Sequence, residues 1–518
     1  MSRPRRRRGL VALALLATAC SGAHATPFRS ADPQARIGGV LRVGILPPGS
    51  VDPGNDYEPA GDLVIRTMCD TLLTTNPRTG EVRPGLVESW VVAADGAKLV
   101  LRLRKDLRFS DGSPLTSADV TYSLSRIASA DFASARADAL ELVAGFAQVH
   151  GDAATDSDAE RRELAGVRTT DNRTVEISLR RPYGDFLRVL TTGLTSPVSR
   201  RAADADPRAF ARSPVCVGPY RLAEPFAPGA TTLRLVRSKA YAPTDSRLTR
   251  GGAAYADEVS FRVFPTAAAM AAAGTELDVR AASPTDLTGV QTGPGPEIEY
   301  LGLPTDTGLF QDAKVRRALA LALSREELVR RVFPSTRTPA GGFLPATAPG
   351  APRCDALPPA GDVDAAVALL DDVGVRLRGR RVALVFNDEL RNRELVTEVA
   401  RQWKGTLGLV ATPTPLTFSA FLTQGRAARG FGAPFRFSWS ADDIDGYLTP
   451  LFSADAIGRD NLSRFSDPTI DQALKRRAWR AVDPADRALA YGRITDLLCE
   501  QMPMIPLTTS LRRYVVND

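Results

Sequence analysis

Residues 84–124 change from the hydrophobic period of a strand to that of a helix within one stretch of chain. Leu99, Leu101 and Leu103 alternate with polar residues over 98–104, apart from the apolar Val100, which is typical of a half-buried strand. Residues 111–112 are Asp-Gly, which favours a tight turn. Residues 116–119 begin with Thr and end with Asp, like a capping box, and apolar residues then recur at helical spacing over 120–127. The stretch therefore predicts a strand, a turn and a helix inside a globular domain.

The rest of the chain repeats this alternation. Apolar runs and period-2 patterns predict strands at 40–46, 175–179, 233–236, 259–264, 382–386 and 435–439. Apolar residues at helical spacing predict helices at 62–73, 312–323, 325–332, 363–370, 395–403 and 486–500. Strands that alternate with helices over 518 residues predict an α/β protein of several domain-sized units.

The amino-acid sequences of residues 84–124 and of two later segments resemble those of one protein family. PGLVESW, ADG and LRLRKDLRFSDGSPLTSADV stand in the order of the signature region of the family 5 extracellular solute-binding proteins, the peptide-type receptors of bacterial ABC importers. CVGPY at 216–220 and VRRALALALSREELV at 315–329 resemble further elements of that family. The resemblance implies an α/β, two-lobed fold of the periplasmic-binding-protein type II, with an extra subdomain in the first lobe and a hinge between the lobes.

The resemblance also implies a division of the chain. We expect a first crossing between the lobes at 258–265 and a return crossing near 504–507. The expected units are a signal peptide at 1–19, a lipidated cysteine and tether at 20–35, lobe I at 36–262 with an inserted subdomain at about 57–195, lobe II at 263–502, and a return to lobe I at 503–518.

The N-terminal residues have the pattern of an export signal. Five arginines precede or flank an apolar run at 10–17, which is too short to cross a membrane. Ala17-Thr18-Ala19 followed by Cys20 resembles a bacterial lipobox, so we expect cleavage after Ala19 and a lipid on Cys20. The alternative is ordinary secretion, by either the general or the twin-arginine route. The leader arginines account for most of the net charge of +7, so the charge does not indicate nucleic-acid binding.

Four other cysteines remain if Cys20 carries a lipid. They are Cys69, Cys216, Cys354 and Cys499. An even number of cysteines in an oxidising compartment favours disulfides, here two. Three pairings are possible and the sequence does not choose among them, while buried free thiols are the alternative.

Residues for common catalytic sites are scarce in this chain. The two histidines are His24, in the tether, and His150, in a polar stretch. No G-x-S-x-G nucleophile elbow, no phosphate-binding G-x-x-x-x-G-K-[ST] loop and no zinc-ligand spacing occur in the sequence. We therefore expect a protein that is not an enzyme and that holds no cofactor and no metal.

The segment FSWSADDID at 437–445 resembles the family's ligand-binding element, aromatic-x-A-D-Y-x-D-P. The resemblance implies that Trp439, Ser440, Asp442 and Asp445 contact the ligand, with Asp442 pairing with the amino group of a peptide. The segment departs from the family pattern at two positions, one of which adds Asp443, so three acids in four residues predict an anionic rim that prefers a cationic group. The alternatives are a turn-forming role for Asp442 and a core role for Trp439.

Two further elements are implied to face the ligand. Pro48, Gly49 and Ser50 correspond to a family loop that pairs its main chain with an extended peptide, although Pro48 removes one N–H donor. Phe132 corresponds to an aromatic residue that contacts the ligand in some members.

These patterns together predict a monomeric receptor, anchored by its lipid to the outer face of a bacterial cell membrane. It would capture a peptide or another small solute, with an amine as a candidate feature, and deliver it to the permease and ATPase subunits of an ABC importer. Two alternatives remain open: a secreted hydrolase that uses carboxylates, and a solute-sensing lipoprotein without a transporter. The sequence does not identify the solute.

Overall fold

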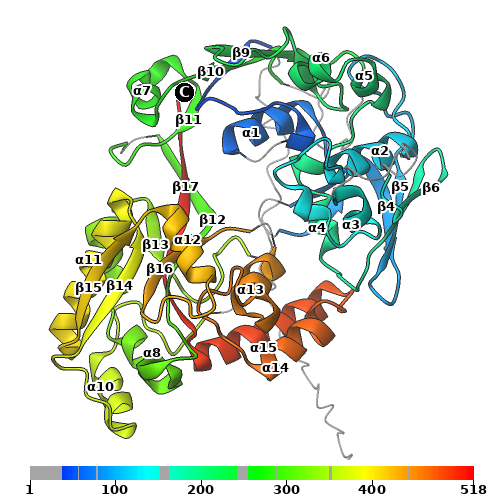
Figure 1. The fold of residues 1–518 in the computed structure, drawn as a ribbon. Coiled ribbons are helices and arrows are strands. Elements are labelled where there is room, and N and C mark those ends of the chain that lie inside the picture. The colour runs from blue at the N-terminus through cyan, green and yellow to red at the C-terminus, as the bar shows by residue number, and fades with distance from the viewer. Residues whose placement is uncertain are drawn as a thin grey trace, which may run out of the picture.

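The computed structural model describes residues 38–55, 58–76, 80–151, 163–241, 255–286, 289–348, 353–441 and 443–517. The expected signal peptide, the tether, Cys20 and Asp442 lie outside the described residues. Buried apolar side chains form three large clusters, from Val43 to Phe261, from Leu72 to Val217, and from Ile298 to Leu507. In Figure 1, the helices and strands that carry the first two clusters lie in the upper and right parts of the molecule, and the helices and strands that carry the third cluster lie below.

One eleven-stranded mixed sheet runs through the molecule. Its order is β15-β14-β16-β12-β17-β11-β1-β10-β9-β8, and β13 also pairs with β17. The strands are β1 (Val40–Ile45), β8 (Tyr220–Leu222), β9 (Thr232–Arg237), β10 (Glu258–Val263), β11 (Val279–Ala281), β12 (Val290–Gly302), β13 (Arg337–Pro339), β14 (Arg381–Asn387), β15 (Val410–Leu416), β16 (Phe435–Trp439) and β17 (Met504–Val516).

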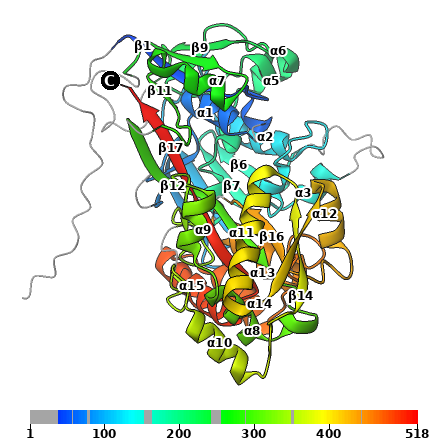
Figure 2. The ribbon, with the colours of Figure 1, turned by 90° about the vertical axis from the view of Figure 1, so that its left-hand side faces the viewer.

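The antiparallel pair β12–β17 connects the two lobes. Its register runs from Val290 opposite Val515 at one end to Gly302 opposite Met504 at the other. Each strand has 13 residues, so the pair is about 43 Å long at the usual strand rise. Figure 2 shows it passing diagonally from β11 in the upper lobe into the lower lobe. We call this pair the hinge ribbon.

Lobe I contains β1 and β8–β11 with α1 (Pro59–Met68), α5 (Arg200–Ala205), α6 (Pro207–Arg212) and α7 (Ala267–Ala272). We expected residues 258–265 to cross between lobes. In the structure, residues 258–263 form β10, which pairs with β1 and β9 inside this lobe. The hinge ribbon makes the crossing instead, with the return at β17 starting at Met504. Because α7 and β11 also belong to lobe I, this lobe extends beyond residue 262, where the sequence predicted its end.

The subdomain beside lobe I is built on a four-stranded sheet of order β4-β5-β7-β6. Its elements are β4 (Val87–Val92), β5 (Lys98–Leu103), β6 (Val167–Asp171), β7 (Thr174–Ser178), α2 (Ser117–Ala128), α3 (Phe146–His150) and α4 (Phe186–Val189), and the hairpin β2 (Leu73–Thr75) and β3 (Val82–Pro84) adjoins it. Thr116 is the N-cap of α2, and its backbone N–H donates to Asp119 at 3.0 Å. The strand, the turn and the capped helix predicted for 84–124 are confirmed.

Lobe II surrounds the third cluster. Its helices are α8 (Ala313–Leu321), α9 (Arg325–Val332), α10 (Val363–Asp372), α11 (Leu390–Leu407), α12 (Phe418–Arg426), α13 (Ile444–Phe452), α14 (Pro468–Ala473) and α15 (Pro484–Gln501). Ser324 caps α9 by accepting a hydrogen bond from the N–H of Glu327 at 3.2 Å, as the sequence predicts. Trp403 of α11 is fully buried, and its indole donates to the carbonyl of Leu319 at 3.0 Å.

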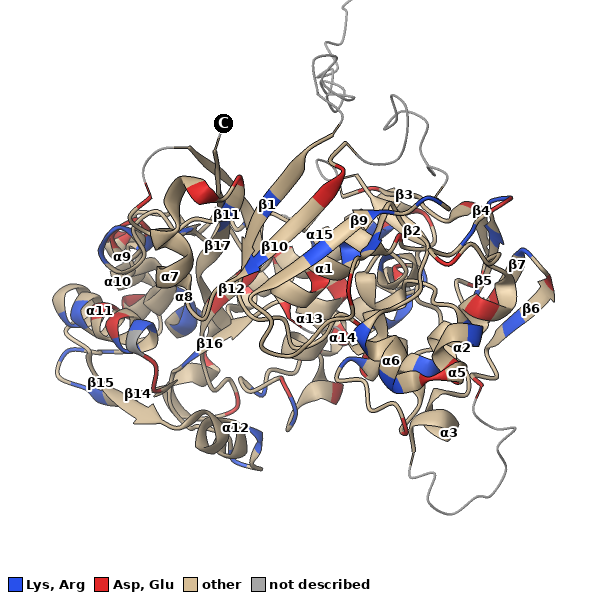
Figure 3. Cartoon of the chain, turned by 90° about the horizontal axis from the view of Figure 1, so that it is seen from above, with Lys and Arg blue, Asp and Glu red and all other residues tan. Residues whose placement is uncertain are grey.

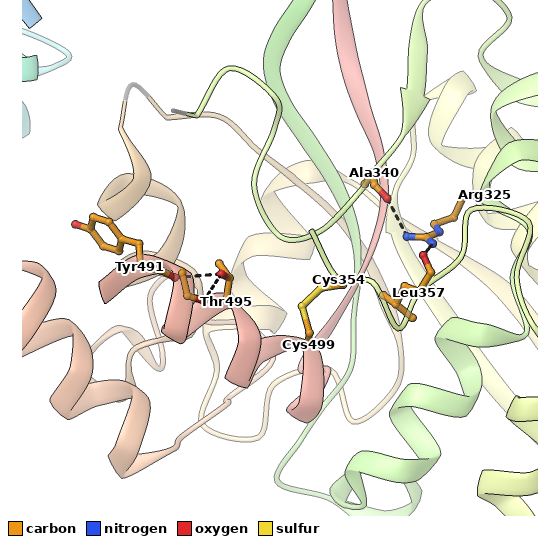
Figure 4. The surroundings of a disulfide bond; sticks show 8 residues. Arg325, Ala340, Cys354, Leu357, Tyr491, Thr495 and Cys499 are labelled. Carbon is orange, nitrogen blue, oxygen red and sulfur yellow. Dashed lines mark hydrogen bonds between the residues drawn. A yellow bond between two sulfur atoms is a disulfide. The ribbon is translucent and has the colours of Figure 1, made fainter. Parts of the chain in front are cut away.

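Two disulfides link distant parts of the chain. Cys69 pairs with Cys216 inside lobe I, and Cys354 pairs with Cys499 inside lobe II. Figure 4 shows the second disulfide joining a loop to α15, with buried Arg325 beside it. That guanidinium donates to the carbonyls of Ala340, at 2.8 Å, and of Leu357. The loop that carries Cys354 is therefore held at two places.

Candidate ligand-binding cleft

Two cavities border the hinge ribbon. The larger, of about 1030 Å³, lies between the lobes, and we call it the interlobe cavity. The second, of about 830 Å³, lies on lobe II and the ribbon, and we call it the aromatic cavity. Both volumes fall in or near the range of small-molecule sites.

The interlobe cavity takes residues from both sides of the hinge. Lobe I and its subdomain contribute Asp62, Arg66, Thr75, Asn76, Gly80, Arg188, Thr191 and Thr192. The hinge ribbon contributes Gln291, Thr292, Gly293, Pro294, Pro296, Arg512 and Tyr514, and lobe II contributes Ala346, Thr347, Ala348, Ala441, Asp443 and Tyr447. Figure 1 shows α1 above and α13 below, with the ribbon beside them. A solute in this cavity would contact both lobes and the hinge at once.

The local periodicities place these side chains. Asp62 and Arg66 are four residues apart on α1 and so share a helix face. Ser510, Arg512 and Tyr514 alternate on β17, so they share one face of the ribbon. Ser510 lines the aromatic cavity and the other two line the interlobe cavity. One face of β17 therefore runs along both cavities.

The aromatic cavity is named for the rings that line it. They are Phe333, Phe418, Phe421, Phe437 and Trp439. Phe421 stacks on Phe437 with ring centroids 6.3 Å apart, and Phe418 is 60% exposed. Such a wall favours an apolar or aromatic part of a ligand.

Charged side chains of the same cavity neutralise one another in a buried network. Glu299, which is fully buried, pairs with Arg436 at 2.6 Å and with Arg337 at 3.6 Å. It also accepts a hydrogen bond from Thr508 at 3.3 Å, and Arg337 pairs with Glu297. Two glutamates and two arginines thus satisfy each other without a ligand, as buried charges must.

Trp439 stands between the two cavities. It is the last residue of β16, it lines the aromatic cavity, and its ring lies 5.9 Å from that of Phe437. Its indole N–H donates to the carbonyl of Gly446 at 2.7 Å, and its partly buried ring packs against the core of lobe II. Ser440 follows as an exposed residue, and Ala441 lines the interlobe cavity. The segment at 439–441 therefore borders both cavities, and its contact with a ligand stays a prediction.

The acids that follow have partners of their own. Asp443 caps α13 by accepting from the N–H of Gly446 at 2.6 Å, and the Tyr183 hydroxyl donates to its other oxygen at 3.1 Å. Burial, together with the nearby carboxyls of Asp185 and Asp445, raises the pKa of Asp443 to about 8. Asp443 is therefore uncharged at neutral pH.

Asp445 is a buried residue in the first turn of α13. It accepts hydrogen bonds from the hydroxyl of Thr449 at 2.7 Å and from the indole of Trp479 at 2.6 Å. Burial raises the pKa of its carboxyl. Asp445 lines neither of the two cavities. Of the three acids that predicted an anionic rim, Asp445 is buried, Asp443 lines the interlobe cavity with both oxygens hydrogen-bonded, and Asp442 lies outside the described residues.

Pro48, Gly49, Ser50 and Phe132 lie in lobe I, away from the linings of the two cavities. The Gly49 N–H donates to Glu58 at 3.1 Å, and Ser50 accepts from the N–H of Asp52 at 3.0 Å. The Phe132 ring lies 3.8 Å from the guanidinium of Arg126, which pairs with Asp52. Their role at the ligand stays a prediction.

Several residues of the cleft were not foreseen from the sequence. Arg66, Arg188 and Arg512 line the interlobe cavity, and Arg337 and Arg436 lie in the aromatic cavity. Arg512 sits in a period-2 pattern that could have placed it on one face of a strand. No pattern in the sequence indicated which face would meet the cleft.

The described residues contain no group of three or more His, Cys, Asp or Glu side chains that could hold a metal ion. Within the same part of the chain, every helix is too short or too polar to cross a bilayer. Basic and acidic residues are interspersed over both lobes in Figure 3.

Comparison with known families identifies the chain's relatives. Residues 81–459 match the family described as bacterial extracellular solute-binding proteins, family 5 middle. A probable deoxycholate-binding periplasmic protein of Escherichia coli (strain K12) is 26% identical over 482 residues, covering 89% of this chain and 86% of that protein. A glutathione-binding protein of Shigella boydii serotype 4 is 24% identical over 531 residues, covering 98% and 94%.

Solved structures share the fold across nearly the whole chain. The unliganded open form of MppA, a periplasmic murein tripeptide binding protein, matches with a TM-score of 0.79 at 22% identity and covers 94% of this chain and 95% of its own. A clavulanic acid biosynthesis oligopeptide binding protein matches with a TM-score of 0.79 at 24% identity, covering 94% and 92%. These matches confirm the predicted two-lobed α/β fold of the type II periplasmic binding proteins.

Proposed function

The chain belongs to the bacterial extracellular solute-binding proteins of family 5, and from this membership we propose that it is the receptor of an ABC importer. It captures a small solute between its lobes and presents the closed form to a permease and its ATPase. The observation that carries the proposal is the interlobe cavity, because lobe I, the hinge ribbon and lobe II all line it. A solute bound there favours closure by contacting both lobes.

The arrangement of the lobes supports an open starting state. The TM-score is 0.79 against the unliganded open form of MppA and 0.62 against a second structure of that protein. The higher score against the open form supports an open arrangement of the lobes in this chain. Closure would bring α1 and the 439–443 segment toward each other across the interlobe cavity.

The relatives indicate which solutes to test. Their names describe deoxycholate binding, glutathione binding and peptide transport. We propose a small organic solute of this kind for the present chain, with Trp439, Ser440 and Asp442 at its binding site and an amine, where the solute has one, at Asp442. We also propose that the chain is exported, carries a lipid on Cys20, acts as a monomer and has no catalytic activity.

Native mass spectrometry of the purified chain tests this function. The experiment compares the mass of the native complex with that of the denatured chain, and then identifies any released small molecule. We expect a solute of a few hundred daltons, released intact. A solute that the chain converts into a different product would instead support a hydrolase.

A further inference from the structure

The two cavities of the cleft differ in charge. The aromatic cavity is balanced, with Arg337, Arg391, Arg426 and Arg436 against four acids. The interlobe cavity carries three arginines against two acids, Asp62 and Asp443. Because Asp443 has a pKa of about 8, only one of these two acids is charged at neutral pH. The interlobe cavity is therefore positively charged.

Two of its arginines have no partner of their own. Arg188 donates to Asp185 at 3.1 Å and to the carbonyl of Gly80 at 2.9 Å. Arg66 and Arg512 are exposed, and neither guanidinium makes a hydrogen bond or an ion pair with any residue that the structure describes. Asp62, by contrast, already has a partner. The two free guanidinium groups lie on different parts of the receptor, Arg66 on α1 of lobe I and Arg512 on the hinge ribbon.

The remaining lining of this cavity suits an anion as well. Gln291, Thr292 and Thr347 offer hydroxyl and amide donors beside the arginines. A cleft of one charge sign attracts solutes of the opposite sign, and a guanidinium binds a carboxylate or phosphate through two parallel hydrogen bonds. In the neighbouring aromatic cavity, aromatic rings and charged side chains that neutralise one another can contact the rest of the solute.

We propose that the solute of this receptor carries an anionic group, a carboxylate or a phosphate, that binds to Arg66 and Arg512 in the interlobe cavity, while an apolar or aromatic part of the same solute occupies the aromatic cavity. This inference rests on the proposed receptor function and assigns its substrate class. An anion held by Arg66 and Arg512 together joins lobe I to the hinge ribbon. An amine at Asp442 is compatible with this assignment, because a zwitterionic solute carries both charges.

Matched probes test the assignment by isothermal titration of the full chain, freed of co-purified solute by dialysis in urea and refolding. The first set is Ala-Phe-Glu, Ala-Phe-Gln and Ala-Phe-phosphoserine, all as C-terminal amides, so that only the third side chain varies. The second set is glutathione with its diethyl ester, and deoxycholate with its methyl ester. We expect each anionic probe that binds to do so about tenfold more tightly than its neutral counterpart. The two peptide anions distinguish a preference for carboxylate from one for phosphate.

Variants show whether the two arginines cause this preference. Arg66→Gln and Arg512→Gln should each reduce the affinity for an anionic probe about tenfold and leave the neutral probe nearly unchanged. Arg208→Gln, which changes an exposed arginine of α6 outside the cavity, is the matched control and should change neither. Melting temperatures of the three variants should equal that of the parent chain, since all three side chains are exposed.

Two results would overturn the inference and leave the receptor function standing. The first is equal binding of anionic and neutral probes in the parent chain and in both cavity variants. The second is a co-purified solute that has no anionic group. If no probe binds and no small molecule co-purifies, both the inference and the receptor function fail.

Discussion

Asp443→Asn provides a sharp test of the protonation state of the cleft. The carboxyl of Asp443 has a pKa of about 8 in the folded chain, against an ordinary value of 3.8, because it is buried near Asp185 and Asp445. The folded chain therefore holds this proton between pH 3.8 and about pH 8, whereas the unfolded chain does not. The stability that the proton contributes is fully present below pH 3.8 and is lost as the pH rises toward 8.

The size of the effect follows from proton linkage. Over that window the free energy of unfolding falls by about 1.4 kcal/mol for each pH unit because of this one group. Asp443→Asn removes the titrating group and keeps an oxygen that can accept the hydrogen bond from the Gly446 N–H. The stability of the variant relative to the parent chain should therefore increase by about 3 kcal/mol between pH 5 and pH 7.

Equilibrium urea unfolding of the solute-free chain at pH 5, 6 and 7, followed by tryptophan fluorescence, measures this difference. Asp111→Asn is the control. Asp111 has a lowered pKa, partly because it accepts hydrogen bonds from Ser113, so its own titration lies below pH 3.8. That variant should show no pH-dependent difference from the parent chain over this range. A constant difference between Asp443→Asn and the parent chain would mean that Asp443 is already ionised in the folded chain, and the positive charge of the interlobe cavity would then be smaller than we infer.

Three further predictions concern the core and the cleft. Arg436→Met should lower the unfolding free energy by about 3 kcal/mol in urea titrations, because it removes a partner of the buried Glu299 carboxylate. The double variant with Glu299→Met should recover much of this lost stability. No loss of stability in the single variant would contradict the role of the network. Replacing both Cys69 and Cys216 by Ser should lower the free energy of unfolding by about 4 kcal/mol in urea titrations, because their disulfide closes a loop with a sequence separation of 147. An unchanged free energy of unfolding would contradict this. Trp439→Ala should weaken binding of the co-purified solute about tenfold in calorimetry, and unchanged affinity would remove Trp439 from the site.

Local signals in the sequence predicted the local elements well. The strand, turn and capped helix of residues 84–124 depend on period and capping, which neighbours in sequence determine. The helix cap at Ser324 has the same origin. The sequence of residues 84–124 also indicated the family, because related proteins share sequence motifs.

The arrangement of the cleft depends on contacts between distant segments, which periodicity does not reveal. The pairing of Cys69 with Cys216 requires knowing that both lie in the core of lobe I. The pKa of Asp443 is raised because the residue is buried and because the carboxyl of Asp185, more than 250 residues away in the sequence, lies near it. Three acids in four residues predict an anionic rim, but their spacing does not reveal that Asp443 accepts a hydrogen bond from Tyr183 and Asp445 one from Trp479.

The proposed capture of a solute between the lobes is tested most directly by small-angle X-ray scattering. The full chain is measured after removal of its co-purified solute and again after the same solute is added back in excess. We expect a smaller radius of gyration with the solute, because both lobes contact it in the interlobe cavity and close around it. Identical scattering curves at saturating solute would contradict closure and with it the proposed mechanism of capture.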